Sequence, residues 1–156
     1  NIRMEDFGFE NAADSIISVI GCDDNQKKSI VLEISEDAWT SRVNIDEVAK
    51  QIKILKSQGF RIALDDYGTE SSNLLRLTKL PIDIVKLDKS LIADVVKDKK
   101  SRLAVRGIAS IAKEMGMAVV AEGVEIEQQA EFLLEENITS HQGFLYSRAK
   151  YPKDIL

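Results

Sequence analysis

The chain has 156 residues, of which 44% are hydrophobic and 30% are charged, which is the composition of an ordinary soluble globular domain. No apolar run approaches the roughly 20 residues of a membrane helix, and the N-terminus lacks the pattern of a secretory signal. The net charge of −5 argues against a partner that is a nucleic-acid polymer, and the single cysteine, Cys22, excludes an internal disulfide and a thiolate metal site. We therefore expect one domain over residues 1–156, located in the cytoplasm or on the cytosolic side of a membrane-anchored protein.

Short β-branched runs alternate along the chain with longer segments of helical period. In chain order, we expect a helix at residues 12–20, a polar connection at 22–28, a strand at 29–34, a helix between 44 and 59, a strand at 60–65, a short helix at 71–79, a strand at 82–87, a helix at 101–115, a strand at 118–122, a helix at 126–137 and a strand at 141–146. This alternation is typical of α/β folds in which about five βα units form a parallel sheet.

Three residues mark the ends of the helix between 44 and 59. Asn44 is placed as the N-cap, Glu47 stands three residues later, and Gly59 stops the helix. Pro81 prevents the short helix at 71–79 from continuing into the next strand.

Polar side chains stand in or just after each predicted strand, and parallel α/β folds place their ligand sites at the carboxyl ends of the strands. In chain order they are Glu33, Asp65 with Asp66, Lys86 with Asp88, Glu122 with Glu125, and Gln142. A single strand-end aspartate is usually a helix cap or a turn former. Five strands that agree instead predict a cluster of oxygen ligands for Mg²⁺, Mn²⁺ or Ca²⁺, with a lysine that could hold an anionic substrate or activate a water.

The adjacent residues Asp65 and Asp66 would face opposite sides of a regular strand. Both can reach one site only where the strand breaks, and we expect Gly68 to supply that break. The lone histidine, His141, precedes Gln142, and a histidine at an exposed strand start is more often incidental than a general base.

Five motifs in the chain resemble the EAL phosphodiesterase family and occur in the family's order. They are Leu-Glu-Ile-Ser-Glu at residues 32–36, Leu-Asp-Asp-Tyr-Gly-Thr-Glu at 64–70, Val-Lys-Leu-Asp at 85–88, Ala-Glu-Gly-Val-Glu at 121–125 and Gln-Gly-Phe at 142–144. The resemblance implies a TIM-type (β/α)₈ barrel, of which this chain is the C-terminal part. The upstream strands, with the Glu-Ala-Leu motif that names the family, are expected to precede it in a longer protein.

The resemblance also implies an activity, the hydrolysis of cyclic di-GMP to linear pGpG with two divalent cations, Mg²⁺ or Mn²⁺. It implies that Glu33 and Asp65 are ligands of one metal, and that Asp66 is a ligand of the second metal or is shared with it. Asn1 would be a further ligand from the end of an earlier strand, Lys86 would position the water, and Glu122 would be the general base or a second-metal ligand. The residues that would support the site or the phosphate are Asp88, Glu125 and Gln142.

Partners also follow from the resemblance, namely an upstream sensory or GGDEF-like domain and a homodimer formed through the region after the paired aspartates. In the loop Gly68-Thr69-Glu70, a glutamate replaces the family's second glycine and its backbone freedom. This departure supports an alternative, a degenerate EAL domain that binds cyclic di-GMP or a protein without cleavage. A metal-dependent barrel lyase or aldolase would share the carboxylates and the lysine, but not the order of the motifs.

Overall fold

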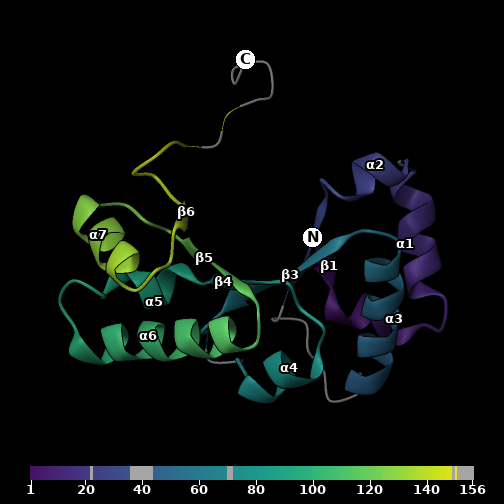
Figure 1. The fold of residues 1–156 in the computed structure, drawn as a ribbon, viewed down its shortest axis with the longest axis horizontal. Coiled ribbons are helices and arrows are strands. Elements are labelled where there is room, and N and C mark those ends of the chain that lie inside the picture. The colour runs from purple at the N-terminus through teal and green to yellow at the C-terminus, as the bar shows by residue number, and fades with distance from the viewer. Residues whose placement is uncertain (22, 36–43, 70–71, 149, 151–156) are drawn as a thin grey trace.

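The computed structural model describes residues 1–21, 23–35, 44–69, 72–148 and 150. One parallel sheet of six strands forms its centre, and each strand lies beside the next one along the chain (Figure 1). The strands are β1 (Ile2–Arg3), β2 (Val31–Ser35), β3 (Arg61–Tyr67), β4 (Ile84–Leu87), β5 (Ala118–Glu122) and β6 (Ser140–Gln142).

Helices connect the strands and pack against the sheet. They are the 3₁₀ helix η1 (Met4–Gly8) and the α-helices α1 (Ala12–Ile20), α2 (Asp24–Lys27), α3 (Ile45–Ser57), α4 (Leu74–Lys79), α5 (Lys89–Ala93), α6 (Lys99–Glu114) and α7 (Glu127–Glu135). α3 contacts β3, while α5 and α6 contact β5. Parallel strands in sequential order with helices between them are a sector of a (β/α) barrel, so the expected partial barrel is confirmed.

Both edge strands differ from the predicted elements. β1 has two residues, which is too short to show a periodic pattern, and it lies where the resemblance puts the end of an earlier strand. β6 ends at Gln142, and the predicted strand at 141–146 was too long. The chain turns there because the Tyr146 amide donates to the Gly143 carbonyl and the Leu145 amide donates to the Val124 carbonyl.

Besides the 3₁₀ helix η1, two short α-helices were not expected from the sequence. The predicted polar connection at 22–28 contains the single-turn α2, and the side chains of Asp23 and Gln26 each accept a hydrogen bond from the other's backbone amide. α5 follows β4 directly, because the Asp88 side chain caps it by accepting from the Ser90 amide at 2.9 Å. Neither helix is long enough for apolar residues to repeat.

The helix predicted between residues 44 and 59 is confirmed as α3. The Asn44 side chain accepts from the Asp46 amide, and Gly59 follows the helix with a φ of +99°. α3 buries Val48, Ile52 and Leu55 as its apolar face. Among the described helices, none combines the length and the apolar character that a crossing of a bilayer requires.

α3 also buries a polar residue, Gln51, whose side chain is hydrogen-bonded on both ends. Its Oε1 accepts from the Ala13 amide at 3.0 Å, and its Nε2 donates at 2.8 Å to the carbonyl of Glu10 and at 2.8 Å to the carboxylate of Glu47. Gln51 therefore fastens α3 to the start of α1, because these backbone groups would lose their partners without it.

We expect Gln51→Met to lower the free energy of unfolding by about 1–3 kcal/mol, because the buried Ala13 amide would keep no partner. Lys50→Met is the matched control, since Lys50 is exposed on the same helix and should change stability by less than about 0.5 kcal/mol. Urea titration followed by circular dichroism measures both. Equal unfolding midpoints for the two variants would contradict this account of Gln51.

Candidate metal and phosphate site

Lys86 on β4 is the centre of a cluster of charged side chains at the carboxyl ends of the strands. Its Nζ lies 2.8 Å from Oε1 of Glu33, 2.7 Å from Oδ1 of Asp65 and 2.7 Å from Oε1 of Glu122. These carboxylates come from β2, β3 and β5. Four of the residues that the sequence analysis singled out are thus brought together.

Strand register explains why these side chains meet. Glu33 pairs with Ala63, which stands two residues before Asp65, and Glu122 stands two residues after the residue that pairs with Lys86. Residues two apart on a strand point to the same side of the sheet. The parallel register therefore directs all four side chains into the inner face of the barrel sector.

Burial and the neighbouring carboxylates have opposite effects on the pKa of Lys86, whose side chain is only 9% exposed. Burial on its own would lower the pKa of the Lys86 ammonium, but hydrogen bonds to Asp65, Glu122 and Glu33 outweigh it and raise the pKa above its ordinary value. The lysine therefore stays charged and neutralises part of the negative charge of the carboxylates.

Asp66 reaches the same site through a break in β3. Its φ is +55°, in the left-handed region, and the pairing of β3 with β4 shifts register between Leu64 and Tyr67. The break thus lies at Asp66 itself, and the expectation that Gly68 supplies it was wrong. A bulge at this point turns the second of two adjacent side chains toward the side of the first.

Asp65, Asp66 and Glu122 form the group that suits a cation. Each offers one carboxylate oxygen, and these oxygens lie within 4.8 Å of one another. Carboxylate oxygens at this spacing are the ligands that Mg²⁺, Mn²⁺ and Ca²⁺ prefer. The three carboxylates therefore fit the divalent metal that the sequence predicts. Glu33 lies next to them, because it contacts Lys86 as Asp65 and Glu122 do.

A hollow of about 370 Å³ opens beside this group. It is lined by Asp66, Asp88, Lys89, Glu122, Gly123, Glu125, Gln142, Gly143 and Phe144. Partial burial would raise the pKa of the Asp88 carboxyl, but hydrogen bonds from Ser90 and the Lys89 amide lower it overall. The predicted supporting residues Asp88, Glu125 and Gln142 thus share one hollow with the candidate metal ligands.

Besides two glycines, the hollow is lined by two residues that were not assigned a role from the sequence, Lys89 and Phe144. Lys89 directly follows Asp88, and Phe144 ends the Gln-Gly-Phe motif, so their places beside motif residues are the signals that could have found them. Phe144 is 61% exposed, and the Arg148 guanidinium lies 4.9 Å from the centre of its ring. The hollow therefore combines carboxylates with one cation and one open aromatic surface.

The remaining predicted residues lie beside the cluster or outside the description. Asn1 precedes Ile2, which pairs with Ile34, so Asn1 stands level with Glu33 on the neighbouring strand. Within the described residues Asn1 makes no hydrogen bond to the cluster, and its role as a ligand stays a prediction.

The Gly68 amide donates to Ser72 Oγ at 2.7 Å, and the Thr69 carbonyl accepts from the Ser72 amide. Glu70 lies outside the described residues.

His141 makes its hydrogen bonds away from the cluster. Its Nε2 donates to the Ile138 carbonyl at 2.8 Å, and its Nδ1 lies 2.6 Å from the Tyr146 hydroxyl. Both ring nitrogens are thus engaged at the edge of the sheet, where they hold β6 to its flanking turns.

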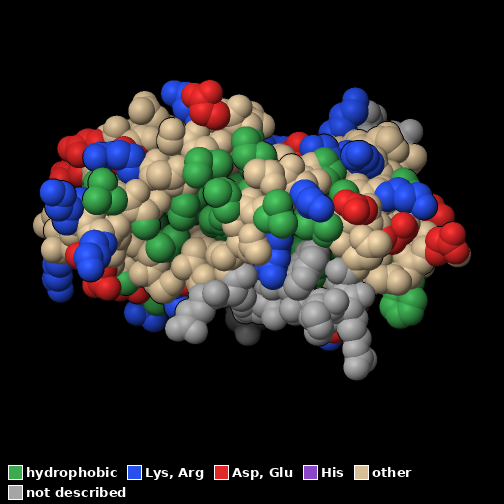
Figure 2. Space-filling view, turned by 90° about the horizontal axis from the view of Figure 1, so that it is seen from below, with side chains coloured by type: hydrophobic (Ala, Val, Ile, Leu, Met, Phe, Trp, Pro, Cys, Tyr) green, Lys and Arg blue, Asp and Glu red, His purple; other side chains and the backbone are tan. Residues whose placement is uncertain are grey.

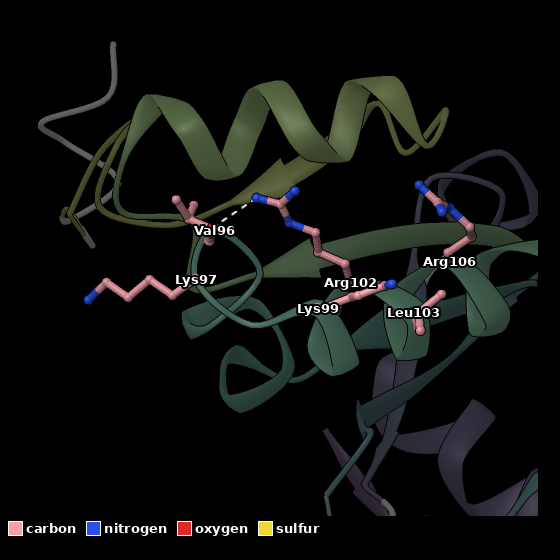
Figure 3. A pocket seen from close by; sticks show the side chains of 6 residues that line it. All are labelled: Val96, Lys97, Lys99, Arg102, Leu103 and Arg106. Atoms are coloured by element: carbon pink, nitrogen blue, oxygen red, sulfur yellow. Dashed lines mark hydrogen bonds between the residues drawn. The ribbon is translucent and has the colours of Figure 1, made fainter.

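Another hollow, of about 420 Å³, lies at the start of α6 and has a different character (Figure 3). It is lined by Val96, Lys97, Lys99, Arg102, Leu103 and Arg106. Arg102 donates to the carbonyls of Val95 and Val96, the second of which Figure 3 marks. Among the described residues that line this hollow none is a carboxylate, so the hollow lacks the anionic ligands of the cluster.

Comparison with known proteins places the chain in one family. The family model described as EAL domain matches residues 1–149. The cyclic di-GMP phosphodiesterase NbdA of Pseudomonas aeruginosa is 38% identical over 117 residues, which are 75% of this chain and 15% of that protein. PdeA of Escherichia coli, a probable cyclic di-GMP phosphodiesterase, is 37% identical over 78% of this chain and 16% of its own length. The chain thus spans less than a quarter of these curated relatives.

Solved structures share the fold over nearly the whole chain. The EAL domain of Mycobacterium smegmatis DcpA has a TM-score of 0.86 and 28% identity over 99% of this chain and 69% of that chain. Klebsiella pneumoniae BlrP1, in a complex with manganese and cyclic di-GMP, has a TM-score of 0.76 and 27% identity over 91% of this chain and 36% of its own. With the family model matched over residues 1–149, the chain belongs to the EAL domain family.

Proposed function

We propose that this chain is part of a phosphodiesterase that hydrolyses cyclic di-GMP to linear pGpG with the help of Mg²⁺ or Mn²⁺. The observation that carries the proposal is the contact of Lys86 with three carboxylates beside the oxygen group of Asp65, Asp66 and Glu122. The relatives NbdA and PdeA and the BlrP1 complex support the substrate and the use of a divalent cation.

Each side chain has a chemical task in this proposal. Asp65, Asp66 and Glu122 hold the cations, together with Glu33 and Asn1, and bound cations would polarise the phosphodiester and lower the pKa of a water. Lys86 orients that water through its ammonium, and Glu122 accepts the proton as the water attacks phosphorus in line with the leaving oxygen. Asp88, Glu125 and Gln142 line the hollow in which the dinucleotide lies.

We also propose the setting in which the site works. The domain acts in the cytoplasm, joined to an upstream sensory or GGDEF-like domain, and it forms a homodimer through the region after the paired aspartates. Support for the dimer comes from α4, on which Leu74 and Leu75 are about half exposed, at 49% and 55%. Figure 2 views the side on which α4 and α6 lie in Figure 1, and it shows hydrophobic side chains gathered across the middle of this face.

We expect the intact protein, supplied with cyclic di-GMP and Mg²⁺ or Mn²⁺, to release linear pGpG, and we expect chelation of the metal to stop the reaction. Lys86→Ala and Asp65→Asn should each lower kcat at least about 100-fold, because each removes a group that acts on the water or its cation. Chromatography of the nucleotide products measures the rate. Lys97→Ala is the control, since this lysine lines the other hollow.

Different results distinguish the rival functions. If the protein binds cyclic di-GMP but does not hydrolyse it with either metal, the phosphodiesterase function is wrong and the chain is a degenerate domain that binds without cleavage. Absence of binding would leave only a protein partner for such a domain. A lyase or aldolase would act on a carbonyl substrate and ignore the dinucleotide.

Replacement of Lys86 by Met should destabilise the metal-free protein by about 3–5 kcal/mol, because three buried or half-buried carboxylates lose their common cation. Mn²⁺ should then raise the melting temperature of Lys86→Met more than that of the parent, since the metal restores positive charge at the same oxygens. Differential scanning calorimetry with EDTA and with Mn²⁺ measures both shifts. An equal Mn²⁺ shift in both proteins would show that the lysine and the metal do not share these carboxylates.

A charge on the α4 surface should separate the proposed dimer. We expect Leu75→Glu to convert the protein to a monomer in light scattering at micromolar concentration, because a buried unpaired carboxylate opposes association. Val19→Glu is the control, because Val19 is 87% exposed on α1, outside the proposed interface. A parent protein that is monomeric at the same concentration would contradict the dimer.

A further inference from the structure

We propose that Gln129 is a positioning residue of the site, which sets the spacing between the ends of β4 and β5 by fastening the turn after β5 to α5. The proposal rests on the proposed function, since it concerns the same metal and phosphate site. Gln129 itself lies on α7, and it does not line the hollow beside the cluster.

The hydrogen bonds of Gln129 join two segments that are far apart in the sequence. Its Oε1 accepts from the Glu125 amide at 2.8 Å and from the Ile126 amide at 3.1 Å, while its Nε2 donates to the Ile92 carbonyl at 3.2 Å. The residue is 5% exposed, so water does not replace these partners at low cost. Its carboxamide uses both of its ends, which a shorter or apolar side chain could not do.

One of the joined segments is the turn that follows Glu122 at the end of β5 and carries Glu125. Gly123 has a φ of +69°, and a Cβ there would lie 2.4 Å from Cβ of Lys89, so the turn lies directly against α5. The turn is also bonded to β6, because the Val124 amide donates to the Gln142 carbonyl at 3.1 Å. Glu122, the last residue of β5, pairs directly with Gln142, and the turn that starts after it supports this strand end and places Glu125.

The other segment is α5, which is separated from the end of β4 by the single residue Asp88. Asp88 caps it, and Ile92 is fully buried, so the Ile92 carbonyl has a fixed place relative to Lys86 at the end of β4. Gln129 therefore connects the strand end that carries Lys86 with the strand end that carries Glu122. The contact of 2.7 Å between these two side chains depends on that spacing.

Gln51 makes it possible to separate this role from a contribution to stability alone. Gln51 is also a buried glutamine in a helix, it is 1% exposed, and it likewise bonds a backbone amide and a backbone carbonyl. Its backbone partners are Ala13, in the first turn of α1, and Glu10, which precedes α1, and neither lies near the site by sequence. Gln51→Met should therefore disturb packing to a similar degree without a change in the spacing of β4 and β5.

The experiment compares Gln129→Met, Gln129→Glu and Gln51→Met in the intact protein, at a temperature where circular dichroism shows each to be folded. Calorimetric titration with Mn²⁺ gives the metal affinity without turnover, and initial rates with cyclic di-GMP give kcat and KM separately. We expect Gln129→Met to weaken Mn²⁺ binding or lower kcat by about 10–100-fold, which is typical of residues that orient metal ligands. Gln51→Met should stay within about twofold of the parent in both.

Gln129→Glu keeps an acceptor for the Glu125 and Ile126 amides but places a carboxylate oxygen against the Ile92 carbonyl, to which it cannot donate. Because two acceptors then face each other, it should weaken Mn²⁺ binding or lower kcat at least as much as Gln129→Met. Equal Mn²⁺ affinity and kcat in Gln129→Met and Gln51→Met would overturn the positioning role, as would a parent that binds no Mn²⁺. A parent that binds Mn²⁺ but does not hydrolyse cyclic di-GMP would overturn the proposed function, while the Mn²⁺ affinities would still decide the role of Gln129.

Discussion

The burial of one ammonium group among three carboxylates is the constraint on which the arrangement of this sheet depends. Lys86 contacts side chains from β2, β3 and β5, so four consecutive strands must keep a common register for the cluster to exist. Charges removed from water are costly unless they are paired with good geometry. The cluster thus penalises any slip of a strand by one residue, since a slip would direct a charged side chain into the apolar layer around the sheet.

Short helices and tight turns attach to this cluster at its rim. α5 receives the chain from β4, packs against Gly68 through Leu91 and against Gly123 through Lys89, and gives its Ile92 carbonyl to Gln129. It has only five residues and itself follows β4, yet it contacts the segments that follow β3 and β5. A small element in this place can hold these two segments close to the end of β4.

Sequence patterns predicted the long helices, the inner strands and most residues of the cluster, because these depend on local periodicity and on the rule that ligands gather at strand ends. The short helices η1, α2 and α5 were missed, since each has at most five residues and no helical repeat of apolar residues can show within it. The bulge at Asp66 was assigned to Gly68, because glycine is the usual sign of a left-handed residue. Gln129 was missed because its partner Ile92 lies 37 residues away in the sequence, and a helical pattern gives no information on such contacts.

The left-handed backbone at Asp66 has a consequence for the evolution of this position. Among residues with a side chain, aspartate and asparagine tolerate a positive φ best, and branched side chains tolerate it poorly. The backbone conformation constrains this position separately from its charge, so glycine or asparagine would preserve the bulge without the carboxylate. A lineage that lost the metal ligand here would thus keep an intact barrel rim.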